Sequence, residues 1–249
     1  PDLRINDGRV TAGITLDHPA GKKLVSFNTD MKVSDMKYTR GGELFGPVGI
    51  NHKSEFRLED GRALRAGHAQ TEIFVGGKSA AKLSDNIEAD FSTGVIDTTN
   101  RLESLNHHIL ALLPNETRKS MDIKAMKVTG KADFKQRKPG DFTLASDLVM
   151  SGTSARLQKP LDGRLAADAD CKAGFIDLRR AELSLLENDQ LQADLTLKGR
   201  FAHPIRSGKS TAELKSSKID INAVKSIFGE SETKKAPAKT PQKPSPGQG

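Results

Sequence analysis

The stretch from Gln190 to Phe201, QLQADLTLKGRF, alternates apolar and polar residues at every second position. Leucine, alanine, glycine and phenylalanine take the odd positions, and Gln, Asp, Thr, Lys and Arg take the even ones. Side chains of a β-strand point alternately to opposite faces of a sheet, so this period of two predicts a strand with one apolar and one polar face. Residues 126–134 have the same period, with Met126, Val128 and Phe134 on the apolar side. The chain is therefore predicted to be built on β-sheet.

Shorter runs with the same period fill much of the chain before residue 100. Residues 10–16 alternate in this way, and so do residues 87–91. The pair Asp60-Gly61 stands between two alternating runs, which is a strong signal for a β-hairpin. These features predict an antiparallel meander. Further turns are expected at Asp7-Gly8, Ala20-Gly21, Gly76-Gly77, residues 138–141, residues 161–163 and residues 187–189.

Residues 39–51 are rich in glycine, with four glycines around Pro47. This composition predicts a flexible loop or an irregular part of the sheet. A phosphate-binding loop is not expected there, because no clear strand precedes the segment and no helix follows it. Near Ala125, the apolar residues change from odd to even positions, which predicts a bulge in the strand.

The period changes after residue 100. Leu102, Leu105, Ile109 and Leu112 recur at helical spacing, and Pro114 stops the run. With Asn100 and Glu103 as a capping pair, these residues predict one amphipathic helix of about three turns. A second short helical turn is predicted at residues 116–120. Near the end of the chain, we expect a strand at residues 212–214, then a short helix closed by Gly229, and a disordered Lys/Pro/Ala-rich tail at residues 230–249.

The charge of the chain is +7, and much of it lies in residues 115–140, which hold eight basic residues and three acidic ones. Lys127, Lys131 and Lys135 occupy the polar side of the strand there and predict a basic outer face. Such a face can attract the phosphates of an anionic membrane surface. It also has a purely structural interpretation, since lysines on outer strand faces prevent edge-to-edge pairing of sheets.

The sequence gives no sign of catalytic, metal or cofactor chemistry. The triplets Gly77-Lys78-Ser79 and Gly208-Lys209-Ser210 lack the earlier glycine and the helix of a nucleotide-binding loop. No two histidines have the spacing of metal ligands on one helix face, and Cys171 is the only cysteine. Aromatic residues lie mostly on the apolar side of their strands, which argues against stacking on nucleic acid bases. We therefore expect a non-enzymatic protein without cofactor, metal or nucleic acid.

The apolar side of so many strands must be covered, because monomers rarely leave more than a few hundred Å² of continuous apolar surface open. The sheet can fold on itself as a β-sandwich, close upon itself, or curl into a trough whose inner wall is covered by lipid tails. Composition alone slightly favours the sandwich, since only 35% of the residues are hydrophobic and 4% are aromatic.

The order of features after residue 100 resembles a known family. A capped helix ending in Leu112-Leu113-Pro114, a short helical turn and the strand of residues 123–134 are similar to the AsmA-like family of bacterial envelope proteins, which are relatives of TamB. The run from Ala212 to Asn222, followed by a short apolar helix and a Lys/Pro/Ala tail, resembles the C-terminal end of the conserved AsmA region. The resemblance covers residues 100–235.

This resemblance implies an elongated, curled antiparallel sheet of many strands, with an apolar groove and one or two short amphipathic helices. It also implies a periplasmic protein, anchored to the inner membrane in its full-length form, that moves phospholipid between membranes and serves outer-membrane biogenesis. The acyl chains would lie against Met126, Val128, Phe134, Phe142, Leu144, Leu148, Leu191, Leu195, Leu197 and Phe201. The alternative is a β-sandwich in which the same residues form an ordinary core.

Two further expectations concern the extent of the protein. Residues 1–229 are predicted to form one mainly β region, with a possible subdivision near residues 100–120. No run of about eighteen apolar residues marks a membrane span, and the chain starts at Pro1 without a methionine, so we expect an anchor upstream of this sequence. The rival function is a structural or adhesive β module that binds protein partners through its basic face and its tail.

Overall fold

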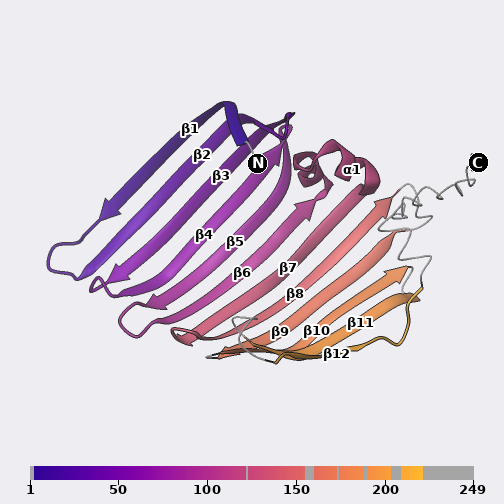
Figure 1. Cartoon of the computed structure of the whole chain (residues 1–249). Coiled ribbons are helices and arrows are strands. Elements are labelled where there is room, and N and C mark those ends of the chain that lie inside the picture. The colour runs from indigo at the N-terminus through magenta and orange to yellow at the C-terminus, as the bar shows by residue number, and fades with distance from the viewer. Residues whose placement is uncertain are drawn as a thin grey trace, which may run out of the picture.

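A computed structural model describes residues 3–121, 123–154, 160–172, 174–187, 190–202 and 209–220 of the chain. The described residues form a mainly β structure, with a single twelve-stranded antiparallel sheet and two short helices (Figure 1). The strands lie in the sheet in the order of the sequence, and each pairs with the next. This is the antiparallel meander that the alternating runs predict, and it confirms the predicted fold class.

The elements follow one another as β1 (Leu3–Asp17), β2 (Leu24–Arg40), β3 (Glu43–Glu59), β4 (Ala63–Val75), β5 (Lys78–Asp90), β6 (Val95–Asn106), the 3₁₀-helix η1 (His107–Leu112), α1 (Asn115–Met121), β7 (Ile123–Lys138), β8 (Asp141–Ser154), β9 (Leu161–Lys172), β10 (Phe175–Glu187), β11 (Gln190–Ala202) and β12 (Thr211–Lys215). Most strands have 12 to 17 residues, which is longer than the five or six that are usual in globular proteins.

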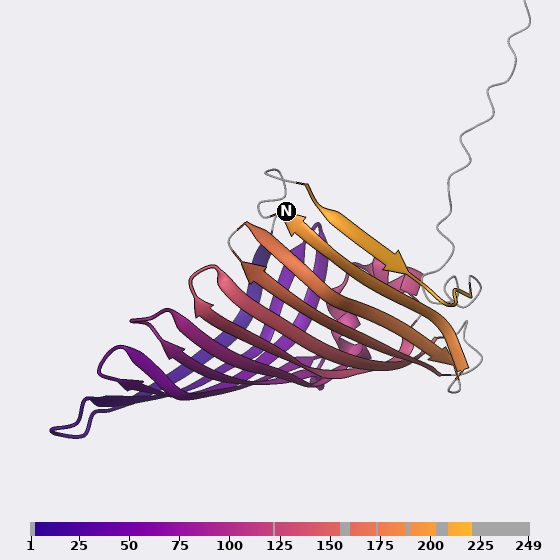
Figure 2. The same cartoon turned by 90° about the horizontal axis from the view of Figure 1, so that it is seen from below.

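The sheet is not flat. Figure 2 shows it bent, so that the first strands and β9–β12 turn toward each other, with the helical segment between β6 and β7 on the concave side. Leu112 of η1 lies on this side, where it lines one cavity together with Met36, Ile50 and Ile73. We call the side that Leu112 contacts the inner face and the opposite side the outer face.

One row of inner-facing residues can be followed through the whole sheet by its cross-strand pairs, and we call it the central inner row. Residues that pair across neighbouring strands point to the same face, so the row runs across the strands near their midpoints. From β1 to β12 it consists of Ile14, Thr29, Ser54, Ala69, Asp85, Asn100, Ala132, Ser146, Ala167, Ala181, Leu197 and Leu214.

The core of this sheet is thin. Among the described residues, those with the least exposure are mostly alanines, such as Ala80 at 0% and Ala202 at 2%, and no large side chain is fully buried. A β-sandwich would bury large apolar residues between two sheets. Because all the described strands belong to one sheet, the sandwich expected as the alternative does not form here.

The predicted helix at residues 100–112 is largely wrong. Leu102 and Leu105 belong to β6, where they pair with Gly130 and Val128 of β7. A register shift between the two pairs brings both leucines to the same face although they are three positions apart, so a strand irregularity imitates helical spacing. Only His107–Leu112 is helical, and its cap is Asn106, whose side chain accepts a hydrogen bond from the backbone N–H of His108 at 3.1 Å.

Two predicted turns are also wrong, because both lie inside strands. Asp7-Gly8 is part of β1, where it causes register shifts against β2, and Gly8 has a φ of 145° that suits glycine. Residues 161–163 open β9 and pair with β8 and β10. Of the glycine-rich segment 39–51, only Gly41-Gly42 is a turn. The rest lies in β2 and β3, with irregular pairing near Met36. The predicted sheet irregularity is therefore confirmed, and the predicted flexible loop is wrong.

Other local predictions are confirmed. The bulge near Ala125 appears as a register shift between Ile123 and Ala125, and α1 contains the helical turn predicted at residues 116–120. The strand around residues 212–214 is β12. The turn at residues 187–189 falls partly outside the described residues, and the final helix and the tail of residues 230–249 do so entirely, so these remain predictions.

Candidate functional site

The register places all ten residues predicted to line the groove on the inner face of β7, β8 and β11. Phe134 pairs with Leu144, Val128 pairs with Met150, and Leu148 lies opposite Gly130. The rings of Phe134 and Phe142 lie 5.1 Å apart. Leu144 is 40% exposed, and the other nine side chains are half-buried. These residues therefore form one wall of apolar side chains that other parts of the described chain do not cover.

The inner faces of β9 and β10 continue this wall between β8 and β11. Leu165 pairs with Leu148 on one side and with Leu183 on the other, and Leu183 pairs with Leu195. The five strands β7–β11, spaced by about 4.8 Å, give a wall about 19 Å long across the strands. An acyl chain in one leaflet of a bilayer spans about 15 Å, half of the hydrocarbon core. The wall is therefore long enough to hold the tails of at least one phospholipid.

The apolar wall also extends over β1–β4, where no lining residues were predicted from the sequence. Small-ligand sites typically have volumes of about 300–1,000 Å³, and here a cavity of about 540 Å³ lies beside Leu112 of η1. Its other lining residues are Leu3, Ile5, Met36, Tyr38, Arg40, Val48, Ile50 and Ile73. The alternation of apolar residues in residues 10–16 and 31–33 was the available signal, but only the part covered by the family resemblance was nominated.

The floor of the groove is not apolar throughout. Between β2 and β6 the central inner row contains Thr29, Ser54, Asp85 and Asn100. The sequence could have revealed Asp85, since it has the same parity as the apolar Ile87 and Ala89. Asn100 was missed because it was assigned to a helix cap.

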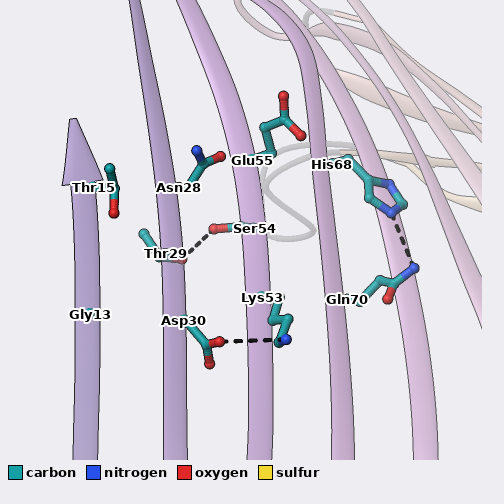
Figure 3. Close-up of a pocket in the computed structure, with 10 residues that line it drawn as sticks. All are labelled: Gly13, Thr15, Asn28, Thr29, Asp30, Lys53, Ser54, Glu55, His68 and Gln70. Carbon is teal, nitrogen blue, oxygen red and sulfur yellow. Dashed lines mark hydrogen bonds and ion pairs between the residues drawn. The ribbon is translucent and has the colours of Figure 1, made fainter. Parts of the chain in front are cut away.

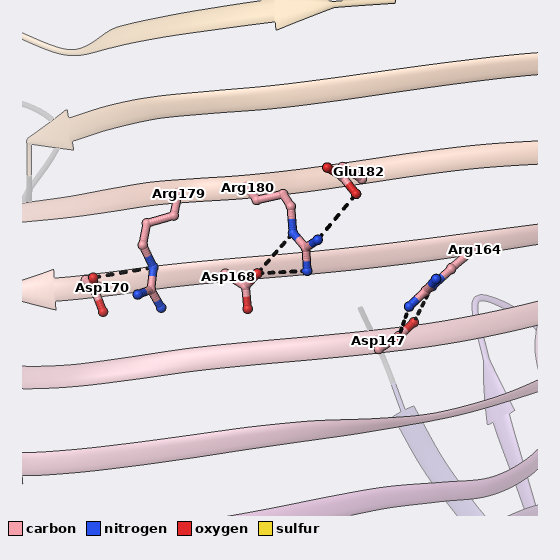
Figure 4. A network of polar contacts seen from close by, with 7 residues as sticks. All are labelled: Asp147, Arg164, Asp168, Asp170, Arg179, Arg180 and Glu182. Atoms are coloured by element: carbon pink, nitrogen blue, oxygen red, sulfur yellow. Dashed lines mark hydrogen bonds and ion pairs between the residues drawn. The ribbon is translucent and has the colours of Figure 1, made fainter.

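The outer face is charged where the inner face is apolar, because oppositely charged side chains pair across its strands (Figure 4). The guanidinium of Arg164 donates two hydrogen bonds to Asp147, with Nε at 2.9 Å from Oδ1 and a terminal nitrogen at 2.5 Å from Oδ2. Arg180 contacts Asp168 at 3.0 Å on the neighbouring strand. These exposed ion pairs make the outer face a hydrated, polar surface, and each pair contributes little to stability by itself.

The ion pair between Asp147 and Arg164 predicts how the stability of the chain changes at acid pH. Hydrogen bonds from Arg164, and the charges of Arg164 and Arg180, hold the pKa of Asp147 below its ordinary value of 3.8. A lowered pKa in the folded state adds stability above the unfolded value, and that stability is lost as the pH falls through the folded value. In thermal unfolding followed by circular dichroism, Asp147→Asn should therefore lower the melting temperature near neutral pH. The difference from the parent should shrink as the pH falls below 3.8 and through the lower pKa of the folded state. Asp17→Asn, at an exposed end of β1, is the control and should leave the melting temperature unchanged at both neutral and acid pH. A melting-temperature difference between Asp147→Asn and the parent that stays constant at all pH values would contradict the role of the pair.

The predicted basic residues lie on the outer face, but their charge is partly neutralised. Lys131 forms an ion pair with Asp133 at 2.8 Å, and Lys135 forms one with Asp97 at 3.2 Å. The hydrogen bond from Lys131 lowers the pKa of Asp133, which favours the charged form of this carboxylate. The outer face is thus mixed in charge around these lysines, and Lys127 adds its charge beside them.

The outer face also has a shallow polar depression of about 420 Å³ over β1–β4 (Figure 3). Lys53 and Asp30 form an ion pair across it at 3.5 Å, and His68 lies 3.3 Å from the side-chain nitrogen of Gln70. Its polar groups mostly pair with each other, so the depression has the chemistry of a hydrated sheet surface.

The histidines and the cysteine of the described residues do not gather into a metal site. Three or more potential metal ligands do not come together anywhere in the described part of the chain. The rings of His107 and His108 are tilted by 48° with centroids 4.1 Å apart, and desolvation lowers the pKa of His108. Cys171 is buried and unpaired. The helices of the described residues are too short and too polar to cross a membrane.

Comparison with known proteins adds no identification. No family model, curated protein or solved structure matches this chain. The resemblance of residues 100–235 to the AsmA-like family therefore remains a prediction from the sequence.

Proposed function

We propose that this chain is a non-enzymatic lipid-binding protein whose inner face holds the acyl chains of phospholipids during their movement between membranes. One observation carries the proposal: a continuous apolar wall crosses β7–β11 on the concave side of the sheet and is left half-exposed, while the outer face is covered by charged pairs. A soluble protein with such a wall needs an apolar partner to cover it.

Acyl chains suit this wall in shape and energy. The wall is curved and long, and it offers leucine and phenylalanine side chains without fixed polar anchors over β9–β11. Each methylene group removed from water contributes about 0.8 kcal/mol. Ten covered methylenes therefore contribute about 8 kcal/mol, which corresponds to micromolar binding before the costs of ordering are subtracted.

The location implied by the family resemblance is part of this proposal. It assigns the protein to the periplasm, with an anchor in the inner membrane in its full-length form, and to the biogenesis of the outer membrane. Residual basic charge on the outer face, at Lys127, would favour contact with an anionic membrane surface.

The proposal is tested by native mass spectrometry of the chain after incubation with phospholipid vesicles and removal of the vesicles. We expect mass additions equal to one or more phospholipids, which disappear after extraction with organic solvent. A mass equal to the bare polypeptide at every lipid concentration would overturn the proposal.

A further inference from the structure

The floor of the groove has two parts of different polarity. Over β7–β10 the central inner row consists of Ala132, Ser146, Ala167 and Ala181, and leucines fill the row beside it. Over β2–β6 the central inner row and the next row contain Thr29, His52, Ser54, Thr71, Asp85 and Asn100. These two rows are thus more polar over β2–β6 than over β7–β10, although Met31, Leu83 and Leu102 in the same rows are apolar.

Most of the polar groups in this part already have partners within the chain. The hydroxyl groups of Thr29 and Ser54 are hydrogen-bonded at 2.5 Å, and His52 Nδ1 lies 2.9 Å from the hydroxyl of Thr71. The side-chain amide of Asn100 donates to the backbone oxygen of Ala132 at 3.4 Å. These groups can be covered by a ligand at modest cost because their hydrogen bonds persist.

Asp85 is different. Its carboxylate has no hydrogen bond or ion pair with any other residue in the described ranges, and it is the only formal charge in the central inner row. Its neighbours in the row are Ala69 and Asn100. Covering an unpaired carboxylate with hydrocarbon costs several kcal/mol, so an acyl chain that lies over Asp85 would be strongly disfavoured.

We infer that Asp85 binds the primary ammonium group of a lipid head group, while the tails of the same lipid lie against the apolar floor of β7–β11. The inference rests on the proposed function and names the lipid class that the groove selects. An ammonium group supplies both the positive charge and the hydrogen-bond donors that the carboxylate lacks. A phosphate without a nearby ammonium group would be repelled by the same charge. The groove should therefore prefer aminophospholipids to anionic phospholipids.

The test measures head-group selectivity. The chain is incubated with vesicles of equal parts phosphatidylethanolamine and phosphatidylglycerol, purified again, and its bound lipids are quantified by mass spectrometry. We expect phosphatidylethanolamine to be enriched about threefold over its share in the vesicles, as for a partly exposed ion pair. Asp85→Asn should bring the ratio back to that of the vesicles, with total uptake within about twofold of the parent, because the tails are bound elsewhere.

Two further variants make the result specific. Glu88→Gln removes the same charge from the outer face of the same strand and should leave the ratio unchanged. Asp85→Leu extends the apolar floor and should raise total uptake while abolishing the preference. Lipid bound without any enrichment in the parent, or an enrichment that survives Asp85→Asn, would overturn the inference and leave the proposed function standing. Absence of any bound lipid in the parent would overturn both.

Discussion

Replacing Leu148 with aspartate is expected to lower phospholipid uptake by about a hundredfold. Leu148 lies on the inner face between Gly130 of β7 and Leu165 of β9, in the middle of the apolar wall. An aspartate at the centre of a hydrocarbon layer costs about 2.5–3.5 kcal/mol, and each 1.4 kcal/mol changes affinity tenfold. Uptake is measured with a fluorescent phospholipid titrated against the purified chain.

Val149 provides the matched control, since it is the next residue on the same strand and faces outward at 49% exposure. Val149→Asp introduces the same charge beside Arg164 on the outer face and should leave uptake within about twofold of the parent, like other exposed charge changes. Leu144→Asp serves as a second inner variant, and because Leu144 is already 40% exposed, we expect this variant to fold. Equal uptake by the inner and outer variants would contradict the groove.

Gly130→Ala is expected to destabilise the sheet by about 2 kcal/mol, within the usual range for overpacking. A Cβ atom at residue 130 would lie 2.8 Å from Cα and 2.6 Å from Cδ2 of Leu148, and against the backbone oxygen of Asp147. The backbone atoms cannot move aside without breaking the pairing of β7 with β8, so the strand itself must shift. The melting temperature should fall by about 4–8 °C, measured by circular dichroism.

Gly13→Ala is the control for this change. Gly13 lies in a strand as well, but the nearest atom to its added Cβ would be the backbone oxygen of Asp30 at 4.0 Å. Alanine there restricts the unfolded chain and should leave the stability unchanged or raise it by less than about 1 kcal/mol. If both variants melt at the same temperature as the parent, the close approach of β7 and β8 at Gly130 is not present in solution.

The alternation of residues predicted strands and their faces well, because a period of two is a local property of the chain. Residues as far apart as Met126 and Phe201 were assigned to one apolar face, and the register joins them on that face through the intervening strands. The helix at residues 100–112 was predicted wrongly because helical spacing was also judged from a local pattern alone. A bulge placed Leu102 and Leu105 on one face, and no local pattern distinguishes such a bulge from the start of a helix.

Other features depend on contacts between distant parts of the chain. Composition slightly favoured a sandwich over an open trough and was misleading, since both arrangements bury one face of each strand. The polar part of the floor combines side chains from five strands, and its meaning appears only when the register aligns Thr29, Ser54, Asp85 and Asn100 in one row. Asp85 by itself is an ordinary acidic residue in the sequence.

The central claim is that lipid tails lie on the inner face and not on the outer one. It is tested most directly by placing a photoreactive amino acid at Leu197, which faces inward, or at Lys198, which is the next residue and faces outward. Each chain is loaded with phospholipid, irradiated and analysed for covalent lipid adducts by mass spectrometry. We predict adducts at residue 197 and none above background at residue 198. Equal labelling at both positions, or labelling at residue 198 alone, would contradict the groove.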